Sequence, residues 1–127
     1  MAPLNGTPGT ILLVDDEPPV RRVTERVLVR WGYSVLTAGS GREALDLARQ
    51  HRGRIDLLIS DLGMPEMDGH ALARAIRQLR PAVAVLFLSG ERPGPAADAP
   101  VTGESFLQKP FTIEELTAKV RGMLPAA

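Results

Sequence analysis

The chain has 127 residues, 15 of them basic and 15 acidic, and it contains no cysteine. This length fits one domain with one sizeable core. The zero net charge argues against direct binding of nucleic acid, and the lack of cysteine excludes a disulfide framework or a thiolate metal site. No apolar run approaches the ~20 residues of a membrane span, and the N-terminus lacks the apolar core of a signal peptide. We therefore expect a cytoplasmic domain without membrane contacts.

The first half of the chain alternates between strand-like and helix-like segments. A flexible lead-in, 1–10, precedes four apolar residues, 11–14, which predict a strand covered on both faces. A helix then begins at Pro18, because proline is tolerated in a first turn, and it ends at Gly32. Residues 33–38 predict a second strand. The apolar residues at helical spacing are Val20, Val23, Val27 and Trp31 in the first helix, and Ala44, Leu45 and Ala48 in a second that runs to about His51.

The second half repeats the alternation. Strands are predicted at 55–60, 83–88 and 105–108. A third helix stops before Pro81, and a last helix begins after Thr112, which forms a capping box with Glu115. The apolar stripes of these two helices are Leu72, Ala75, Ile76 and Leu79, and Ile113, Leu116, Val120 and Met123. Regular alternation of this kind predicts a parallel sheet with right-handed crossovers and helices on both faces.

One segment interrupts this alternation. Residues 92–103 stand where a helix should join the fourth and fifth strands, but they contain three prolines and two glycines. Interior proline costs a helix ~3 kcal/mol and glycine ~1 kcal/mol, so at most one turn is expected. The fourth helix is predicted to be short or missing and the segment to be the most mobile internal part of the chain. A surface loop without a functional role is the alternative.

Polar residues follow four of the predicted strands. These residues are Asp15, Asp16, Asp61, Ser89 and Lys109. Each alone is weak evidence, because an acid or serine after a strand is often a cap or the start of a turn. In a parallel sheet, however, all these strand ends lie along one edge, which is where sites occur in open α/β sheets.

Three carboxylates at one edge repel one another, and without a cation at least one pKa would rise. A hard divalent cation relieves this conflict, and oxygen ligands of this kind suit Mg²⁺. A carboxylate beside Mg²⁺ and Lys109 can act as a nucleophile on a phosphoryl group, while Ser89 supplies a hydroxyl for one phosphoryl oxygen. The set predicts a site that forms an acyl phosphate on one of these carboxylates.

These residues closely resemble the receiver domain of two-component response regulators. The resemblance extends over about 11–124, with a short tail at 125–127. The motifs that carry it are Val14-Asp15-Asp16-Glu17, Ser60-Asp61, Met64-Pro65, Met67-Asp68-Gly69, Leu88-Ser89-Gly90 and Phe106-Leu107-Gln108-Lys109-Pro110-Phe111. It implies a flavodoxin-like (CheY-like) three-layer sandwich, with a five-stranded parallel sheet in the order 2-1-3-4-5. The Ser-Gly and Phe-Leu-Gln-Lys-Pro-Phe motifs look most like receivers of hybrid sensor histidine kinases.

The resemblance also implies roles for the residues of the site. Asp61 would accept the phosphoryl group, and Lys109 would pair with it. Asp16 and Asp61 would bind Mg²⁺ directly, and Asp15 would act mainly through a water molecule. The main-chain carbonyl of Gly63 would be the third protein ligand.

Two further residues are implied to switch conformation. Ser89 would move toward the phosphoryl oxygen, and Phe106 would rotate inward as it does so. The peptide bond between Lys109 and Pro110 is expected to be cis. Glu91 departs from the family, which usually has an aromatic residue there.

The function implied is that of a signalling switch rather than an enzyme with external substrates. Its phosphoryl group would come from a sensor histidine kinase or a histidine phosphotransfer protein, and it would regulate a partner or an attached domain as a monomer or weak homodimer. One alternative is an interaction module with this fold that is no longer phosphorylated. Another is a phosphatase or phosphotransferase, which ranks last because Gly63 stands where such enzymes have a second acid.

Overall fold

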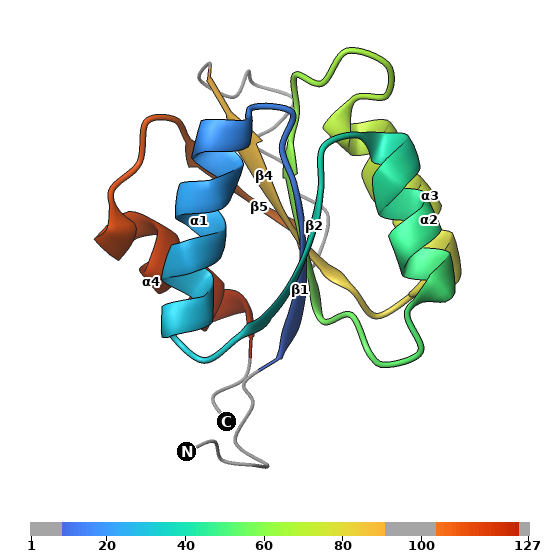
Figure 1. Ribbon diagram of the computed structural model, residues 1–127, viewed down its shortest axis with the longest axis horizontal. Helices are drawn as coiled ribbons and strands as arrows, with labels where there is room; N and C mark the ends of the chain where they lie inside the picture. Colours follow the sequence, from blue (N-terminus) through green and yellow to red (C-terminus); the bar gives the residue numbers. More distant parts are fainter. Residues whose placement is uncertain (1–8, 91–103, 125–127) are drawn as a thin grey trace.

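A five-stranded sheet forms the centre of the molecule. The computed structural model describes residues 9–90 and 104–124. All strand pairs are parallel, and the order is β2-β1-β3-β4-β5, which confirms the predicted topology (Figure 1). The strands are β1 (Thr10–Val14), β2 (Ser34–Ala38), β3 (Leu57–Asp61), β4 (Ala84–Ser89) and β5 (Glu104–Gln108).

Helices cover both faces of this sheet. The described residues contain α1 (Pro18–Arg30), α2 (Gly41–Gln50), α3 (Gly69–Leu79) and α4 (Ile113–Met123). Figure 1 shows α1 and α4 on one face and α2 and α3 on the other, which confirms the three-layer sandwich. The predictions for the lead-in before residue 9, for Glu91 and the segment 92–103, and for the tail 125–127 lie outside the described residues.

The core is two clusters, one on each face of the sheet. Successive residues of β1 enter different clusters, because neighbouring side chains of a strand point to opposite faces. Ile11 and Leu13 pack in the cluster that includes Leu28 of α1, whereas Leu12 and Val14 pack in the cluster that includes α2 and α3. These four residues of β1 are fully buried. This explains why the strand is a continuous apolar run rather than an alternating one.

Three helices begin at a side-chain cap. The Ser40, Asp68 and Thr112 side chains accept hydrogen bonds from the backbone N–H groups three residues on, at 3.1, 2.8 and 3.0 Å. At α4 the Glu115 carboxylate also accepts from the Thr112 N–H at 2.8 Å, so the predicted capping box is confirmed. These caps satisfy backbone donors that the first turn of a helix leaves unpaired.

The buried side of α1 differs from the predicted apolar stripe. The fully enclosed residues are Thr24 and Leu28, whereas Val23 and Trp31 are 59% and 48% exposed. Thr24 is tolerated in the core because its hydroxyl donates to the Val20 carbonyl at 2.8 Å. Trp31 lies at the end of the helix, where the Arg121 guanidinium stands 5.4 Å from the ring centroid. The predicted stripe was wrong for Val23 and Trp31, whereas Val27 packs against the core as expected. Thr24 was missed because a purely apolar pattern gives no weight to a buried threonine.

Leu58→Ala tests the importance of the central strand. Leu58 is fully buried in the cluster beneath α2 and α3. We expect the free energy of unfolding to fall by roughly 2–5 kcal/mol, because the substitution removes apolar contacts and leaves a cavity. Denaturant unfolding measures this loss. Leu79→Ala is the control, because Leu79 is 40% exposed and should lose less than about 1 kcal/mol. Equal losses in the two variants would contradict this account of the core.

Candidate functional site

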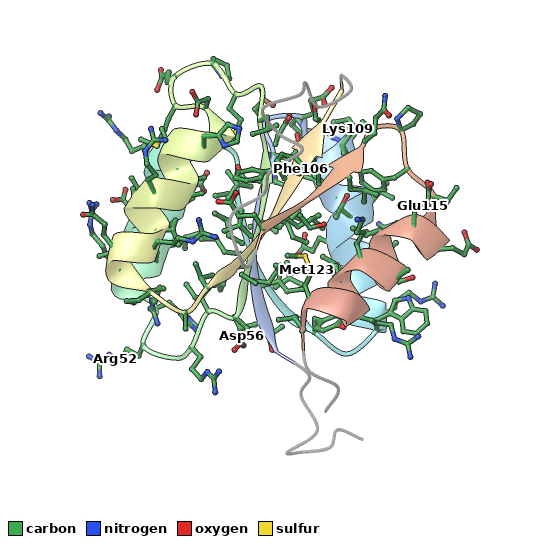
Figure 2. All side chains as sticks on the ribbon, turned by 180° about the vertical axis from the view of Figure 1, so that it is seen from behind. Arg52, Asp56, Phe106, Lys109, Glu115 and Met123 are labelled. Atoms are coloured by element: carbon green, nitrogen blue, oxygen red, sulfur yellow. The ribbon has the colours of Figure 1, made fainter. Side chains whose placement is uncertain are left out.

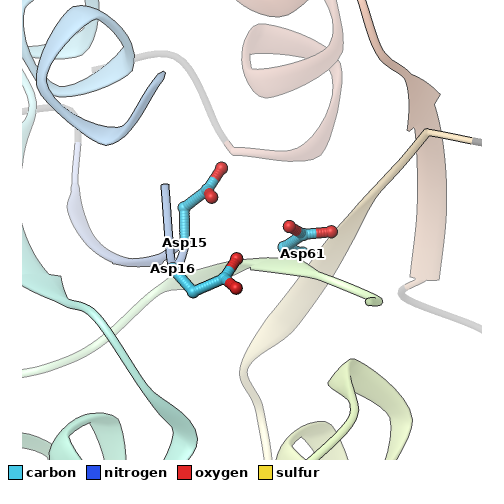
Figure 3. A group of neighbouring side chains, drawn as sticks. All are labelled: Asp15, Asp16 and Asp61. Atoms are coloured by element: carbon cyan, nitrogen blue, oxygen red, sulfur yellow. The ribbon is translucent and has the colours of Figure 1, made fainter. Parts of the chain in front are cut away.

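Three carboxylates meet at the C-terminal edge of the sheet. Asp15 and Asp16 directly follow β1, and Asp61 is the last residue of the neighbouring β3. Each offers a carboxylate oxygen, and these atoms all lie within 4.8 Å of one another. Figure 3 shows the three side chains grouped around a common space. Asp15 is fully buried and Asp61 is 8% exposed, so water screens their repulsion poorly.

Local hydrogen bonds hold the first acidic loop in this position. The Arg21 guanidinium donates to the Asp15 carbonyl at 2.7 Å, which ties the first turn of α1 back to the end of β1. The Glu17 N–H donates to the Asp15 carboxylate at 2.9 Å. The loop therefore orients the Asp15 carboxylate before any ligand binds.

The loop after β3 is held close to the strand in a similar way. The Gly63 N–H donates to the Asp61 carboxylate at 3.2 Å. Gly69 begins α3 so close to this loop that a Cβ there would lie 2.8 Å from the Asp61 carbonyl oxygen. Only glycine fits this contact without movement of the backbone, which accounts for the glycine of the Met-Asp-Gly motif.

Lys109 supplies the positive charge of the site. It follows β5, its N–H donates to the Ser89 carbonyl at 2.7 Å, and the bond from Lys109 to Pro110 is cis as expected. Its ammonium group donates to Asp15 at 3.1 Å, to Glu17 at 3.1 Å and to Asp61 at 3.2 Å. One cation thus joins the ends of β1, β3 and β5.

Burial and ion pairing act in opposite directions on the titration of Lys109. Partial burial lowers its pKa, but hydrogen bonds to Asp15 and Glu17, together with the charge of Asp15, outweigh this and raise the pKa above its ordinary value. Burial is also the main influence on Asp15 and raises the pKa of that carboxyl, although the Glu17 N–H and Lys109 oppose it. Lys109 is thus held charged, and Asp15 has a cost of burial that a further cation would reduce.

The remaining predicted residues lie around this group. Ser89 ends β4, one residue after Leu88, which is the register partner of Asp61. Phe106 lies in β5 below Lys109 (Figure 2), and its ring centroid is 5.3 Å from that of the buried Phe87. The structure therefore places the Ser89 hydroxyl at the same edge as the carboxylates, and the Phe106 ring in β5, the neighbour of the strand that carries Ser89.

Sequence reasoning missed the contacts of Glu17 and Arg21. Glu17 was noted only as part of the acidic motif, although its carboxylate reaches Lys109. The signal was its place directly after the acidic pair, on a loop that must turn toward the same edge. Arg21 lies one helical turn beyond that loop, within reach of its carbonyl groups.

The arrangement suits binding of a cation and an anion side by side. Clustered carboxylate oxygens are ligands for a hard divalent cation, and Lys109 lies beside them. A cavity of about 390 Å³, lined by Asp16, Arg42 and Met64 among others, adjoins the acidic group. Of the three acids, Asp16 is the one that lines this cavity.

A family model described as "Response regulator receiver domain" matches residues 11–121. The chain belongs to this family. It is thus a receiver domain of two-component phosphorelay signalling, and domains of this family are generally not enzymes with external substrates.

Curated relatives carry this domain within longer proteins. The chain is 40% identical over 118 residues to the sensor kinase CckA of Brucella abortus, covering 91% of this chain and 12% of that protein. It is 34% identical over 122 residues to the probable transcriptional regulatory protein TcrX of Mycobacterium tuberculosis, covering 94% of this chain and 51% of that protein. The chain thus spans at most about half the length of these two relatives.

Solved receiver structures share the fold. The receiver domain of the hybrid histidine kinase CckA has a TM-score of 0.81 and 42% identity, over 92% of this chain and 100% of that one. The response regulator TrrA of Thermotoga maritima, solved in complex with Mg²⁺-BeF, has a TM-score of 0.79 and 31% identity, over 91% of this chain and 99% of that one.

In the described residues of the receiver, no helix is long and apolar enough to cross a bilayer.

Lys109→Met tests the electrostatic balance of the site. The substitution leaves Asp15 and Asp61 without their shared cation, so we expect the free energy of unfolding to fall by about 1–3 kcal/mol at neutral pH. Because the pKa of Asp15 would rise further in the folded state, the folded protein would take up a proton more readily than the unfolded one. The deficit should therefore shrink as the pH falls through the folded pKa toward the unfolded value.

Denaturant unfolding at several pH values measures this effect. Lys119→Met is the matched control, because Lys119 is exposed and contacts only the Ser105 hydroxyl among the hydrogen bonds of the described residues. A deficit in Lys109→Met that stayed constant with pH would argue against the electrostatic explanation.

Proposed function

We propose that this receiver accepts a phosphoryl group on Asp61 in a Mg²⁺-dependent reaction. The observation that carries the proposal is the contact of the Lys109 ammonium group with Asp61, at 3.2 Å, within a group of three carboxylates. Phosphoryl transfer depends mainly on positioning and on neutralisation of charge, and these residues supply both.

The reaction would transfer the phosphoryl group from a histidine nitrogen to an aspartate oxygen. A carboxylate oxygen of Asp61 attacks phosphorus, the P–N bond of the donor phosphohistidine breaks, and its electron pair returns to the imidazole ring. Lys109 binds a phosphoryl oxygen and offsets its negative charge, and the Ser89 hydroxyl is the donor to another. The product is an acyl phosphate on Asp61.

The carboxylates of Asp16 and Asp61 and the main-chain carbonyl of Gly63 would hold Mg²⁺, and Asp15 would act through a bound water. When bound, Mg²⁺ neutralises charge on the transferred group. The donor set supports this assignment, because it consists of oxygen atoms only.

The proposed donor is a sensor histidine kinase or a histidine phosphotransfer protein. Similarity to the receiver of the sensor kinase CckA supports a partner of this class. The phosphorylated form would pass its signal on by movement of Ser89 and Phe106. Phe106 is only partly buried at its place in the edge strand β5, which supports a change of rotamer there.

Asp61→Asn tests the acceptor. Wild-type protein incubated with acetyl phosphate and Mg²⁺ should gain the mass of one phosphoryl group, and Asp61→Asn should gain none, because an amide oxygen is a poor nucleophile. Intact-mass spectrometry measures the gain. Asp46→Asn is the control, because Asp46 is an exposed acid on α2 that should leave phosphorylation unchanged.

Two outcomes would contradict this function. Wild-type protein that gains no mass and binds no beryllofluoride would instead be a receiver-fold interaction module without phosphoryl chemistry. Steady turnover of an external phosphate ester would indicate a phosphatase.

Asp16→Asn tests the metal. Mg²⁺ should raise the melting temperature of wild-type protein, because it binds the folded state and reduces repulsion among the carboxylates. In Asp16→Asn the affinity for Mg²⁺ should fall by roughly ten-fold or more, because one charged ligand is lost. Glu66→Gln is the control, an exposed acid on the loop after β3 that lines the adjoining cavity. Equal affinities in wild type and Asp16→Asn would refute the assigned ligand set.

A further inference from the structure

The hydrogen-bonding capacity of Lys109 is already in use. A lysine ammonium group has three N–H donors and no acceptor. In this structure it donates to three different carboxylates, those of Asp15, Glu17 and Asp61. A phosphoryl oxygen can therefore reach Lys109 only if one of these bonds is given up.

The three carboxylates differ in what their release would cost. The side chain of Asp15 is 1% exposed and that of Asp61 is 11% exposed, so either would be left as a poorly solvated charge. Asp61 is also the nucleophile and must stay beside the phosphoryl group. The side chain of Glu17 is 58% exposed, so water can replace Lys109 as its partner.

The surroundings of Glu17 leave it space to move. Glu17 and Lys109 line a cavity of about 570 Å³ beside α1, together with apolar residues such as Val20 and Val23. The backbone of Glu17 is fixed by its N–H bond to Asp15, so the side chain can turn away while the loop keeps its shape.

We propose that Glu17 is a positioning residue that competes with the phosphoryl group for Lys109. It holds the ammonium group in the unphosphorylated protein and releases it when a phosphoryl oxygen arrives. Because the bond between Lys109 and Glu17 must break before a phosphoryl oxygen can take its place, Glu17 weakens the binding of phosphoryl-like anions and slows phosphorylation. This inference rests on the proposed acceptor role of Asp61.

Two substitutions of Glu17 separate its contact from its charge. Glu17→Gln removes the charge and weakens the bond to Lys109. Glu17→Asp keeps the charge but shortens the side chain by one methylene, which moves the carboxylate out of reach of Lys109. Glu66→Gln is the control. It also removes a negative charge close to the acidic group, but Glu66 is not one of the carboxylates that accept from Lys109.

The test measures the affinity for beryllofluoride at saturating Mg²⁺ and the rate of phosphorylation by acetyl phosphate. We expect both to rise at least three-fold in Glu17→Gln and in Glu17→Asp, and to change less than two-fold in Glu66→Gln. The affinity for Mg²⁺ alone should stay within two-fold of wild type in all three. If the affinity and the rate stayed at wild-type values in both Glu17 variants, the proposal would be overturned. An increase in Glu17→Gln alone would also overturn it, because the charge of Glu17 rather than its contact with Lys109 would then be responsible.

The side-chain ammonium signal of Lys109 gives a second readout that needs neither metal nor phosphoryl group. In nitrogen-15 NMR spectra its protons should exchange with water faster in both Glu17 variants than in wild type or Glu66→Gln. Unchanged exchange would overturn the proposal even if phosphorylation proceeds. Failure of every variant, wild type included, to bind beryllofluoride would instead remove the proposed function and the inference with it.

Discussion

The geometry of this receiver depends on one cation shared among carboxylates. Asp15 and Asp61 are buried within a few ångströms of each other, a situation that favours protonation of one of them or opening of the loops. Lys109 opposes this by pairing with both. Because the three residues come from the ends of β1, β3 and β5, the same interaction joins the central part of the sheet to its edge.

The sheet makes this concentration of charge possible. Its parallel strands are covered on both faces, so the core residues of β1 and β3 are held by two apolar clusters rather than one. That rigidity fixes the strand ends, and the acids therefore cannot separate to relieve their repulsion. The edge of the sheet therefore holds several negative charges close together, an arrangement that could bind a divalent cation.

Much of this organisation could be predicted from the sequence. Continuous apolar runs such as residues 11–14 identified buried strands, and the ends of four strands then indicated the polar residues of the site. Within the described residues, this was enough for the parallel sheet and for the polar edge, whereas the strand order was implied by the resemblance to receiver domains. Alternating strands and helices predict a parallel sheet reliably because the connection of parallel strands depends on the path of the backbone and not on the details of side-chain packing.

Side-chain contacts could be predicted less well from the sequence. The buried side of α1 was misjudged because Thr24 satisfies its hydroxyl within the helix, which a count of apolar residues cannot register. The contact between Glu17 and Lys109 was missed because it joins residues 92 positions apart, through a side chain that is mostly exposed. A motif indicates which groups gather at an edge, but the sharing of three N–H donors among them is a property of the folded geometry.

The position of Trp31 has a consequence for spectroscopy. It is the only tryptophan in the sequence, and it lies at the end of α1 opposite to the acidic loop, roughly 20 Å away by the rise of a helix of this length. Its indole ring faces Arg121, which lies in the last turn of α4. A metal ion among the carboxylates is too distant to quench its emission by contact. A change of fluorescence on ligand binding would thus report a change near the contact between α1 and α4, and the protein carries its own probe of how far a change at the site travels.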